Sequence, residues 1–324
     1  MRVATLDDGT REGRLIVVTA DQTRAVNASI AFTLLEALES WKTCEPILRS
    51  QAAAVEFDPQ ASFALDYEAV LAPLPRAPQW LDGSAFRTHS DLVSQAWQVA
   101  SPFLDSTPLM YQGASDDFIP ARGPCYLPDE ADEIDLEAEV AVIVDDVPMG
   151  VSSDAALEHI KLVMLANDVS LRAFGPREMR TGFGFLQAKP STVFSPLAVT
   201  PDALGVRWQR GRFHHPITAR VNGRWIGSPN AAHMFFTFGD LIAHAARTRR
   251  LRAGTIIGSG TVSDPDRGTG STTIVEVRAV EKLQRGEPQT PYLKFGDRVE
   301  IEAVDEKGLS IFGRIDHTIL RKLN

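Results

Sequence analysis

A proline-rich stretch divides the chain near residue 75. Pro73, Pro75 and Pro78 lie within six residues of the segment AVLAPLPRAPQW. Proline lacks the backbone N–H that a helix or a central strand needs, so we interpret this stretch as an extended linker. We therefore predict a small N-terminal α/β domain over residues 1–75 and a larger domain over residues 76–324.

The hydrophobic pattern predicts the elements on both sides of this linker. Before it, RVATL and GRLIVVT alternate as short strands do, and residues 26–50 carry a helical spacing. After it, we expect helices near 154–166 and 236–249, and strands at 134–144, 217–222, 255–258, 273–280 and 298–304. This mixture predicts an α+β fold with mostly antiparallel strands.

Composition excludes several classes of protein. With 44% hydrophobic and 23% charged residues, the chain of 324 residues can bury a sizeable core. A formal charge of −9 argues against a nucleic-acid partner, and no apolar run is long enough for a membrane span. Cys44 and Cys125 are too few for a disulfide framework. We expect a cytoplasmic protein.

The segment IDLEAEVAVIV holds the most informative charges. In a strand, Asp135, Glu137 and Glu139 share one face, which continues as the apolar Ala141 and Ile143. Adjacent carboxylates that run into a buried face must share a proton or bind a cation. The alternative is an ordinary antiparallel strand with one solvated face.

Three further motifs carry polar side chains that suit a site. Asp82 precedes His89 by seven residues, and Asp168 lies in NDVSLR, where we expect a helix to end. Each could equally belong to a turn or to the surface. The glycine-rich segment GSGTVS is not a P-loop, but its backbone could hold a carboxylate.

Together and in this order, the motifs resemble those of the fumarylacetoacetate hydrolase family. The resemblance covers about residues 76–315, and the segment before it resembles a shortened version of the family's N-terminal domain. The matching pieces are Asp82-x6-His89, Glu137-Ala-Glu139, Asp168 and Arg172 in NDVSLR, Lys189 in FGFLQAKPSTVFSP, and GSGTVS around Thr261.

The resemblance implies a mixed β-roll catalytic domain, usually in a homodimer, that binds a small diketo acid. It also implies one divalent cation, Mg²⁺ or Ca²⁺, held by Asp82, Glu137, Glu139 and Asp168. Four oxygen ligands without Cys or His suit such a hard ion.

The resemblance further implies hydrolysis of a carbon–carbon bond in a 1,3-diketo acid. The substrate would be fumarylacetoacetate or a related acylpyruvate, in tyrosine degradation or other aromatic catabolism. The implied catalytic residues are His89 as general base, Glu276 as its partner, and Lys189 and Arg172 as charge-stabilising groups. The implied substrate contacts are Tyr111, Thr261 and Ser84, with Ser84 standing where the family has an aromatic residue.

Two other readings stay open. A decarboxylase, tautomerase or hydratase of a 2-oxo acid could use the same scaffold, although the spacing of Asp82 and His89 favours the hydrolase. A non-catalytic metal-dependent binding protein would need the carboxylates but not the base.

Overall fold

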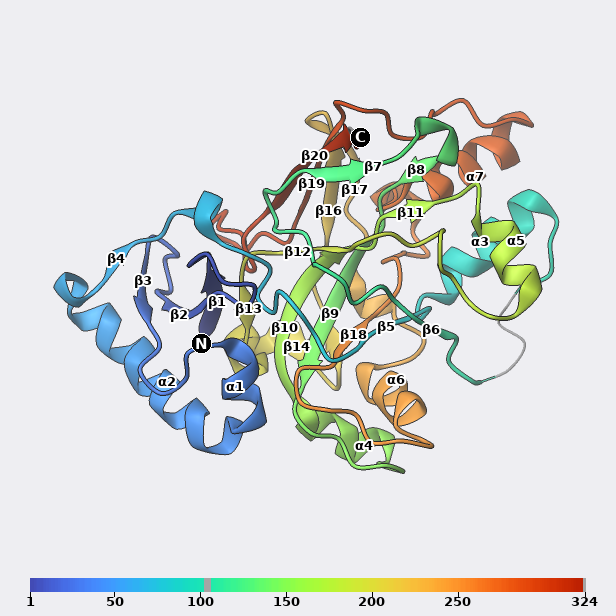
Figure 1. Ribbon diagram of the computed structural model, residues 1–324. Coiled ribbons are helices and arrows are strands. Elements are labelled where there is room, and N and C mark those ends of the chain that lie inside the picture. The colour runs from blue at the N-terminus through green and yellow to red at the C-terminus, as the bar shows by residue number, and fades with distance from the viewer. Residues whose placement is uncertain (102–105, 323–324) are drawn as a thin grey trace.

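The computed structural model describes residues 1–101 and 106–322, and a large mixed sheet organises it (Figure 1). The strand order is β4-β3-β2-β1-β13-β10-β9-β18-β5-β6, with β12 paired to β10. Its N-terminal strands are β1 (Arg2–Leu6), β2 (Arg14–Val18), β3 (Arg24–Asn27) and β4 (Phe63–Ala64). Its central strands are β5 (Trp80–Gly83), β6 (Met110–Gln112), β9 (Ala138–Val144), β10 (Ile160–Asn167), β12 (Val193–Phe194), β13 (Ala198–Val199) and β18 (Ile256–Gly258).

A second sheet, of five strands, has the order β17-β16-β19-β20-β7. Its strands are β7 (Cys125–Leu127), β16 (Thr218–Val221), β17 (Arg224–Gly227), β19 (Arg298–Glu302) and β20 (Ile315–Arg321). Two small pairs are β8 (Ile134–Asp135) with β11 (Ser170–Leu171), and β14 (Trp208–Gln209) with β15 (Arg212–Phe213).

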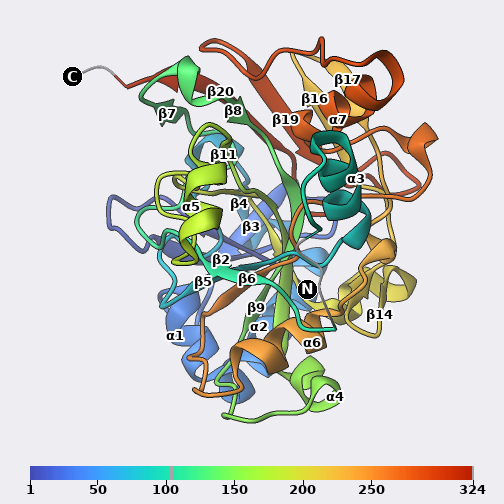
Figure 2. The same cartoon turned by 90° about the vertical axis from the view of Figure 1, so that its right-hand side faces the viewer.

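The helices surround these sheets. Two belong to the N-terminal part: α1 (Leu34–Glu39) and α2 (Trp41–Phe57). The others are α3 (Arg87–Trp97), α4 (Ser153–Ala156), α5 (Gly175–Thr181), α6 (Phe238–Ala245) and α7 (Ile274–Arg285). Helices α3 and α7 lie side by side, as Figure 2 shows. The structure thus contains both helices and sheets. The predicted α+β fold with a small N-terminal domain is confirmed.

Strand β9 separates two hydrophobic cores. Val140 and Val142 belong to one core, whereas Ala141 and Ile143 belong to the other. The alternation expected from the sequence is therefore correct, but no face of this strand is solvated. With both faces covered, the strand is apolar along its whole length after Glu139.

Two predicted elements were of the wrong type. Helix α4 ends at Ala156, and residues 160–167, expected to be helical, form the buried strand β10. Such a short apolar run fits a buried strand as well as a helix. Conversely, residues 273–280 were predicted as a strand, but α7 begins at Ile274. Its buried face follows a helical spacing through Ile274, Val275 and Ala279.

The predicted N-terminal helix also begins later than expected, because β3 occupies residues 24–27 and α1 starts at Leu34. Strands β16, β18 and β19 and helix α6 lie where the sequence predicts them. Across the two described ranges, no helix has the length and apolar character to cross a membrane.

Strand β20 carries a buried histidine, His317, beside Asn167 at the end of β10. The Asn167 side-chain amide donates to Nε2 of His317 at 2.9 Å, and its oxygen accepts the backbone N–H of Glu137. Among the described residues, Nδ1 of His317 has no hydrogen-bond partner. Burial lowers the pKa of His317 from 6.5 to about 4, so this ring is neutral in the folded protein.

We expect this histidine to destabilise the protein in mild acid. Its folded pKa is lower than its unfolded pKa, so stability present above pH 6.5 is lost as the pH falls toward 4. The loss attributable to His317 should reach about 3 kcal/mol. Urea unfolding of the wild type and His317→Gln at pH 7 and pH 4.5 measures it. Equal losses in the two proteins would contradict the assignment.

Candidate active site

Three carboxylates meet where neighbouring strands of the large sheet end. Glu139 lies on β9, Asp82 on β5, and Asp168 directly after β10. One oxygen of each lies within 4.8 Å of the others. Strand β18 lies between β9 and β5, and its Gly258 pairs with Asp82 on one side and Ala141 on the other. The sheet itself therefore assembles the cluster.

Burial sets the electrostatics of these three groups. Asp82, Glu139 and Asp168 are all buried. Burial, followed by the charge of Asp168, raises the pKa of Asp82 to about 8. Burial and the charge of Asp82 raise the pKa of Glu139 well above its ordinary value. Without a cation, some of these carboxyls must keep their protons; a divalent cation would remove that requirement.

The cluster fits a hard divalent cation. Within the described residues, Oε1 of Glu139 is buried and has no hydrogen-bond partner, so one ligand atom is free. Gly258 leaves room, because a Cβ there would lie 2.3 Å from Oδ1 of Asp82 and 2.9 Å from Oε2 of Glu139. The donors are all carboxylate oxygens, which suit Mg²⁺, Ca²⁺ or Mn²⁺.

Gly258→Ala should therefore weaken cation binding by about tenfold or more, as losses beside metal ligands typically do. The added methyl group must displace Asp82 or Glu139. Gly175→Ala is the matched control, because a Cβ there meets nothing within 4 Å. Calorimetric titration with Mn²⁺ measures both affinities. Equal binding by the two variants would show that the space at Gly258 is not needed.

Glu137, the fourth predicted ligand, is engaged by two cationic side chains. Arg172 donates to its Oε1, and Nζ of Lys189 donates to its Oε2 at 2.8 Å. Burial opposes ionisation, but Lys189 and Arg172 outweigh it and hold the pKa of Glu137 below its ordinary value. Glu137 is not among the three clustered carboxylates, so its role as a ligand stays a prediction.

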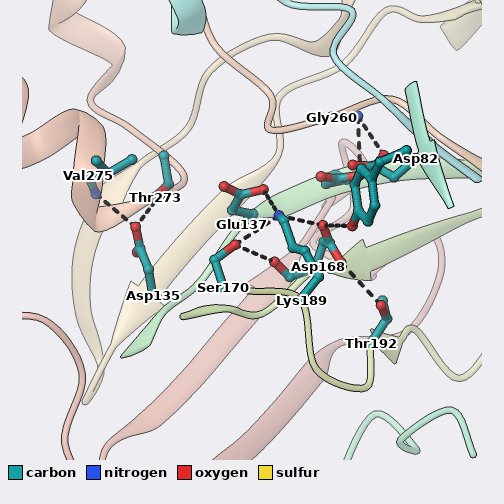
Figure 3. A network of polar contacts seen from close by, with 12 residues as sticks. Asp82, Asp135, Glu137, Asp168, Ser170, Lys189, Thr192, Gly260, Thr273 and Val275 are labelled. Atoms are coloured by element: carbon teal, nitrogen blue, oxygen red, sulfur yellow. Dashed lines mark hydrogen bonds and ion pairs between the residues drawn. The ribbon is translucent and has the colours of Figure 1, made fainter. Parts of the chain in front are cut away.

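Lys189 links Glu137 to the cluster (Figure 3). Its ammonium also donates to Oδ2 of Asp168 at 2.6 Å and to the Ser170 hydroxyl at 2.8 Å. Burial opposes its charge, but Asp168 and Glu137 keep the pKa of Lys189 above its ordinary value. A fixed positive charge therefore lies beside a candidate ligand.

His89 and Glu276, predicted as a pair, are in contact. Nδ1 of His89 lies 2.9 Å from Oε1 of Glu276. Each residue is in the first turn of its helix, and α3 packs on α7 through Leu92, Ala96 and Ala279. Glu276 is buried, whereas the His89 side chain is 18% exposed. The pair thus joins a protected carboxylate to an accessible imidazole.

The predicted substrate residues surround this centre to different degrees. The Tyr111 hydroxyl donates to Oδ2 of Asp168 at 2.6 Å, so it lies against the cluster. Thr261 is buried directly after Gly260. Ser84 follows β5, and its hydroxyl lies 3.4 Å from that of Ser90. Their contacts with substrate stay predictions.

The glycine-rich segment binds carboxylates, as predicted, but the two that it binds belong to the protein itself. The Gly260 N–H donates to Oδ1 of Asp82 at 3.1 Å and to Oε2 of Glu139 at 3.2 Å. The amide orients both groups, as Figure 3 shows for Asp82.

Sequence reasoning missed several residues of the site. Ser170 lies two residues after Asp168 and contacts Lys189, which strand spacing could have suggested. Thr192, by contrast, is a residue that the resemblance also matches, in FGFLQAKPSTVFSP, and its hydroxyl donates to Oδ1 of Asp168 at 3.2 Å. The Phe185 ring packs edge-on against Tyr111, with centroids 5.2 Å apart, and has no sequence signal.

An all-oxygen cluster and a His–Glu pair are features that metal-dependent hydrolases and isomerases use. The chain belongs to the fumarylacetoacetate hydrolase family. The family model described as fumarylacetoacetate (FAA) hydrolase C-terminal matches residues 79–320. The model described as fumarylacetoacetase N-terminal domain 2 matches residues 1–76. Members of this superfamily are hydrolases, isomerases and tautomerases.

Curated relatives carry several activities. Oxaloacetate tautomerase fahd2 of Xenopus laevis is 27% identical over 48% of this chain and 47% of its own length. Fumarylacetoacetase of Caenorhabditis elegans is 28% identical over 60% of this chain and 52% of its own. The chain thus spans about half the length of these relatives.

Solved structures share the fold. A putative HpcE protein from Mycobacterium smegmatis has a TM-score of 0.69 at 17% identity, with both chains fully covered. Maleylpyruvate hydrolase from Sphingobium sp. SYK-6, in complex with manganese (II) ion and pyruvate, has a TM-score of 0.66 at 15% identity, also over both whole chains. These likenesses support the predicted fold.

Proposed function

We propose that the chain hydrolyses a carbon–carbon bond in a 1,3-diketo acid, fumarylacetoacetate or a related acylpyruvate, using one divalent cation. The observation that carries this proposal is the bond of 2.9 Å between His89 and the buried Glu276. A hydrolase needs a base for water, and this pair provides one near the acidic cluster. His89 is close enough to Glu137 for its charge to lower that pKa, after the effects of burial, Lys189 and Arg172.

The cation would be held by Asp82, Glu139 and Asp168, with Glu137 as a further candidate. Lewis-acid polarisation of the substrate carbonyls would come from the bound ion. A manganese-containing neighbour in the family makes Mn²⁺ a candidate alongside Mg²⁺ and Ca²⁺.

Different residues of the chain transfer the proton and stabilise the developing charge. With Nδ1 of His89 donating to Glu276, Nε2 is the nitrogen that takes a proton from water. Hydroxide adds to the acyl carbonyl, and the bond to the neighbouring methylene carbon breaks. A proton returns to that carbon, giving a carboxylic acid and an oxo acid, which is pyruvate from an acylpyruvate and acetoacetate from fumarylacetoacetate. Lys189 and Arg172 offset the negative charge that develops.

A second candidate is tautomerisation of a 2-oxo acid such as oxaloacetate. Relatives named oxaloacetate tautomerase, 27–31% identical, favour it. Tautomerisation moves a proton and leaves the carbon skeleton intact, so it needs a base but no added water. Identification of the products distinguishes the two reactions.

A substrate panel tests the proposal. The protein loaded with Mn²⁺ is given fumarylacetoacetate, acetylpyruvate, oxaloacetate and a neutral 1,3-diketone at one metal concentration. We expect cleavage of the two diketo acids and much slower turnover of the neutral diketone, which lacks a carboxylate. If only oxaloacetate is turned over, the proposed reaction is tautomerisation and not hydrolysis. Equal cleavage of the neutral diketone would overturn the diketo-acid specificity.

A further inference from the structure

Asp135 is a fully buried carboxylate that lies outside the acidic cluster. It shares a strand face with Glu137 and Glu139 in the sequence, but β8 ends at Asp135 and β9 begins only at Ala138. Its side chain turns toward helix α7, as Figure 3 shows. None of the roles assigned above uses it.

The carboxylate of Asp135 replaces the missing cap of α7. Thr273, at the N-cap position, makes no capping hydrogen bond with its side chain. Instead, Asp135 accepts the backbone N–H of Ile274 at 2.7 Å and of Val275 at 3.0 Å, together with the Thr273 hydroxyl at 2.8 Å. First-turn amides have no partner within the helix, so this contact fixes where α7 begins.

The catalytic carboxylate follows one residue later. Glu276 is the third residue of α7, and its position relative to His89 depends on where that first turn lies. Because Asp135 holds the two preceding amides, any movement of its side chain would also move Glu276.

The same carboxylate also anchors Arg172, which pairs with Glu137. Nε of Arg172 donates to Oδ2 of Asp135 at 2.9 Å, while its terminal NH2 group reaches Glu137 and, at 3.0 Å, the Thr273 hydroxyl. Arg172 is therefore fixed between two carboxylates, and Asp135 is the one that also contacts α7.

We propose that Asp135 is a positioning residue that holds the His89–Glu276 pair and the Arg172–Glu137 pair in one arrangement. This inference rests on the proposed function for its kinetic consequences. It does not assign Asp135 any contact with substrate or cation, because its four hydrogen-bond donors come from Arg172, Thr273, Ile274 and Val275.

The test combines Asp135→Asn with His89→Ala. Alone, Asp135→Asn should lower kcat by about tenfold or more, the factor expected for lost hydrogen bonds to a charged group. In the His89→Ala background, Asp135→Asn should lower kcat by a factor at least threefold smaller. The His89–Glu276 pair that Asp135 positions is already broken there. Equal losses in both backgrounds would overturn the proposal.

Hydrogen exchange provides a readout that needs no substrate. The first-turn amides of α7 should exchange about tenfold faster or more in Asp135→Asn, and unchanged exchange would contradict the hold on this helix. If wild-type protein cleaves none of the panel, the proposed function fails while this readout still decides the role of Asp135. Should Asp135→Asn not fold, Thr273→Val, which removes the shared hydroxyl, is measured in the same ways.

The matched control is Asp240→Asn, on α6. Asp240 accepts from the Thr237 backbone N–H and hydroxyl, both at 2.8 Å, so it also holds a helix start. We expect this variant to lose stability without losing kcat. If Asp240→Asn lowers kcat as much as Asp135→Asn does, a general loss of helix capping explains both losses. The proposed positioning role of Asp135 would then be wrong.

Discussion

Replacing Glu139 with glutamine should abolish tight binding of the divalent cation and lower turnover to background. Glu139 offers the buried oxygen that has no partner among the described residues, and it belongs to the cluster with Asp82 and Asp168. An amide keeps the shape but removes the charge that a hard cation needs. We expect Mn²⁺ affinity to fall by about 10²-fold or more, beyond the usual effect of a residue that only supports a ligand.

The same change should stabilise the metal-free protein. Burial and the charge of Asp82 raise the pKa of Glu139 in the folded state. A raised folded pKa contributes stability that is present below the unfolded pKa and lost as the pH rises. At pH 7 the unfolded wild type is ionised at this position, so part of this stability is lost; glutamine cannot ionise, so the metal-free variant should be more stable than the wild type.

Urea unfolding in chelator and in excess Mn²⁺ measures both effects. The expected pattern is opposite in sign: Glu139→Gln is more stable than the wild type without metal, and less stable with it. The gain without metal should shrink toward pH 4.5. A variant that keeps wild-type Mn²⁺ affinity, shown by elemental analysis after dialysis, would contradict the proposed metal centre.

His89→Ala should lower kcat by about 10²-fold or more, the usual loss for a general base, with the fold and the metal affinity intact. The reason is the geometry of the pair: Glu276 orients Nδ1 of His89, which leaves Nε2 for the proton. Since His89 lies outside the set of three clustered carboxylates, cation binding should not change. Steady-state kinetics on acetylpyruvate measures the loss.

A second histidine–carboxylate pair supplies the control for this variant. His159 lies 2.6 Å from Asp145, which follows β9 at the end opposite to Glu139. His159→Ala should therefore leave kcat within about twofold of the wild type, because surface changes away from a site have small effects. A His89→Ala enzyme as active as this control would transfer the base to another residue.

Much of the candidate site could be predicted from local sequence. The alternation of IDLEAEVAVIV places Glu139 next to a buried face, and the structure buries it completely. The spacing of Asp82 and His89 also carried over, because a short loop between β5 and α3 fixes both. In both cases, the sequence pattern lies within a few residues of the side chain whose position it predicts.

The remainder depends on contacts between distant segments. The start of α7 is held by Asp135, whose hydrogen bond with Thr273 spans 138 positions of the sequence. Local sequence cannot show this contact, and the β-branched run TTIVEV by itself predicts a strand. Likewise, nothing local shows that Lys189 lies against Glu137, which is 52 positions away. Strand β10 was mistaken for a helix because burial on both faces removes the alternation that identifies a strand.

Product analysis in ¹⁸O-labelled water tests the central claim most directly. Wild-type protein loaded with Mn²⁺ is incubated with acetylpyruvate, and the products are identified by mass spectrometry. Hydrolysis predicts acetate carrying solvent oxygen and an equal amount of pyruvate, both absent with His89→Ala at the same reaction time. An intact carbon skeleton with only solvent hydrogen exchanged, or release of carbon dioxide instead of acetate, would contradict carbon–carbon bond hydrolysis.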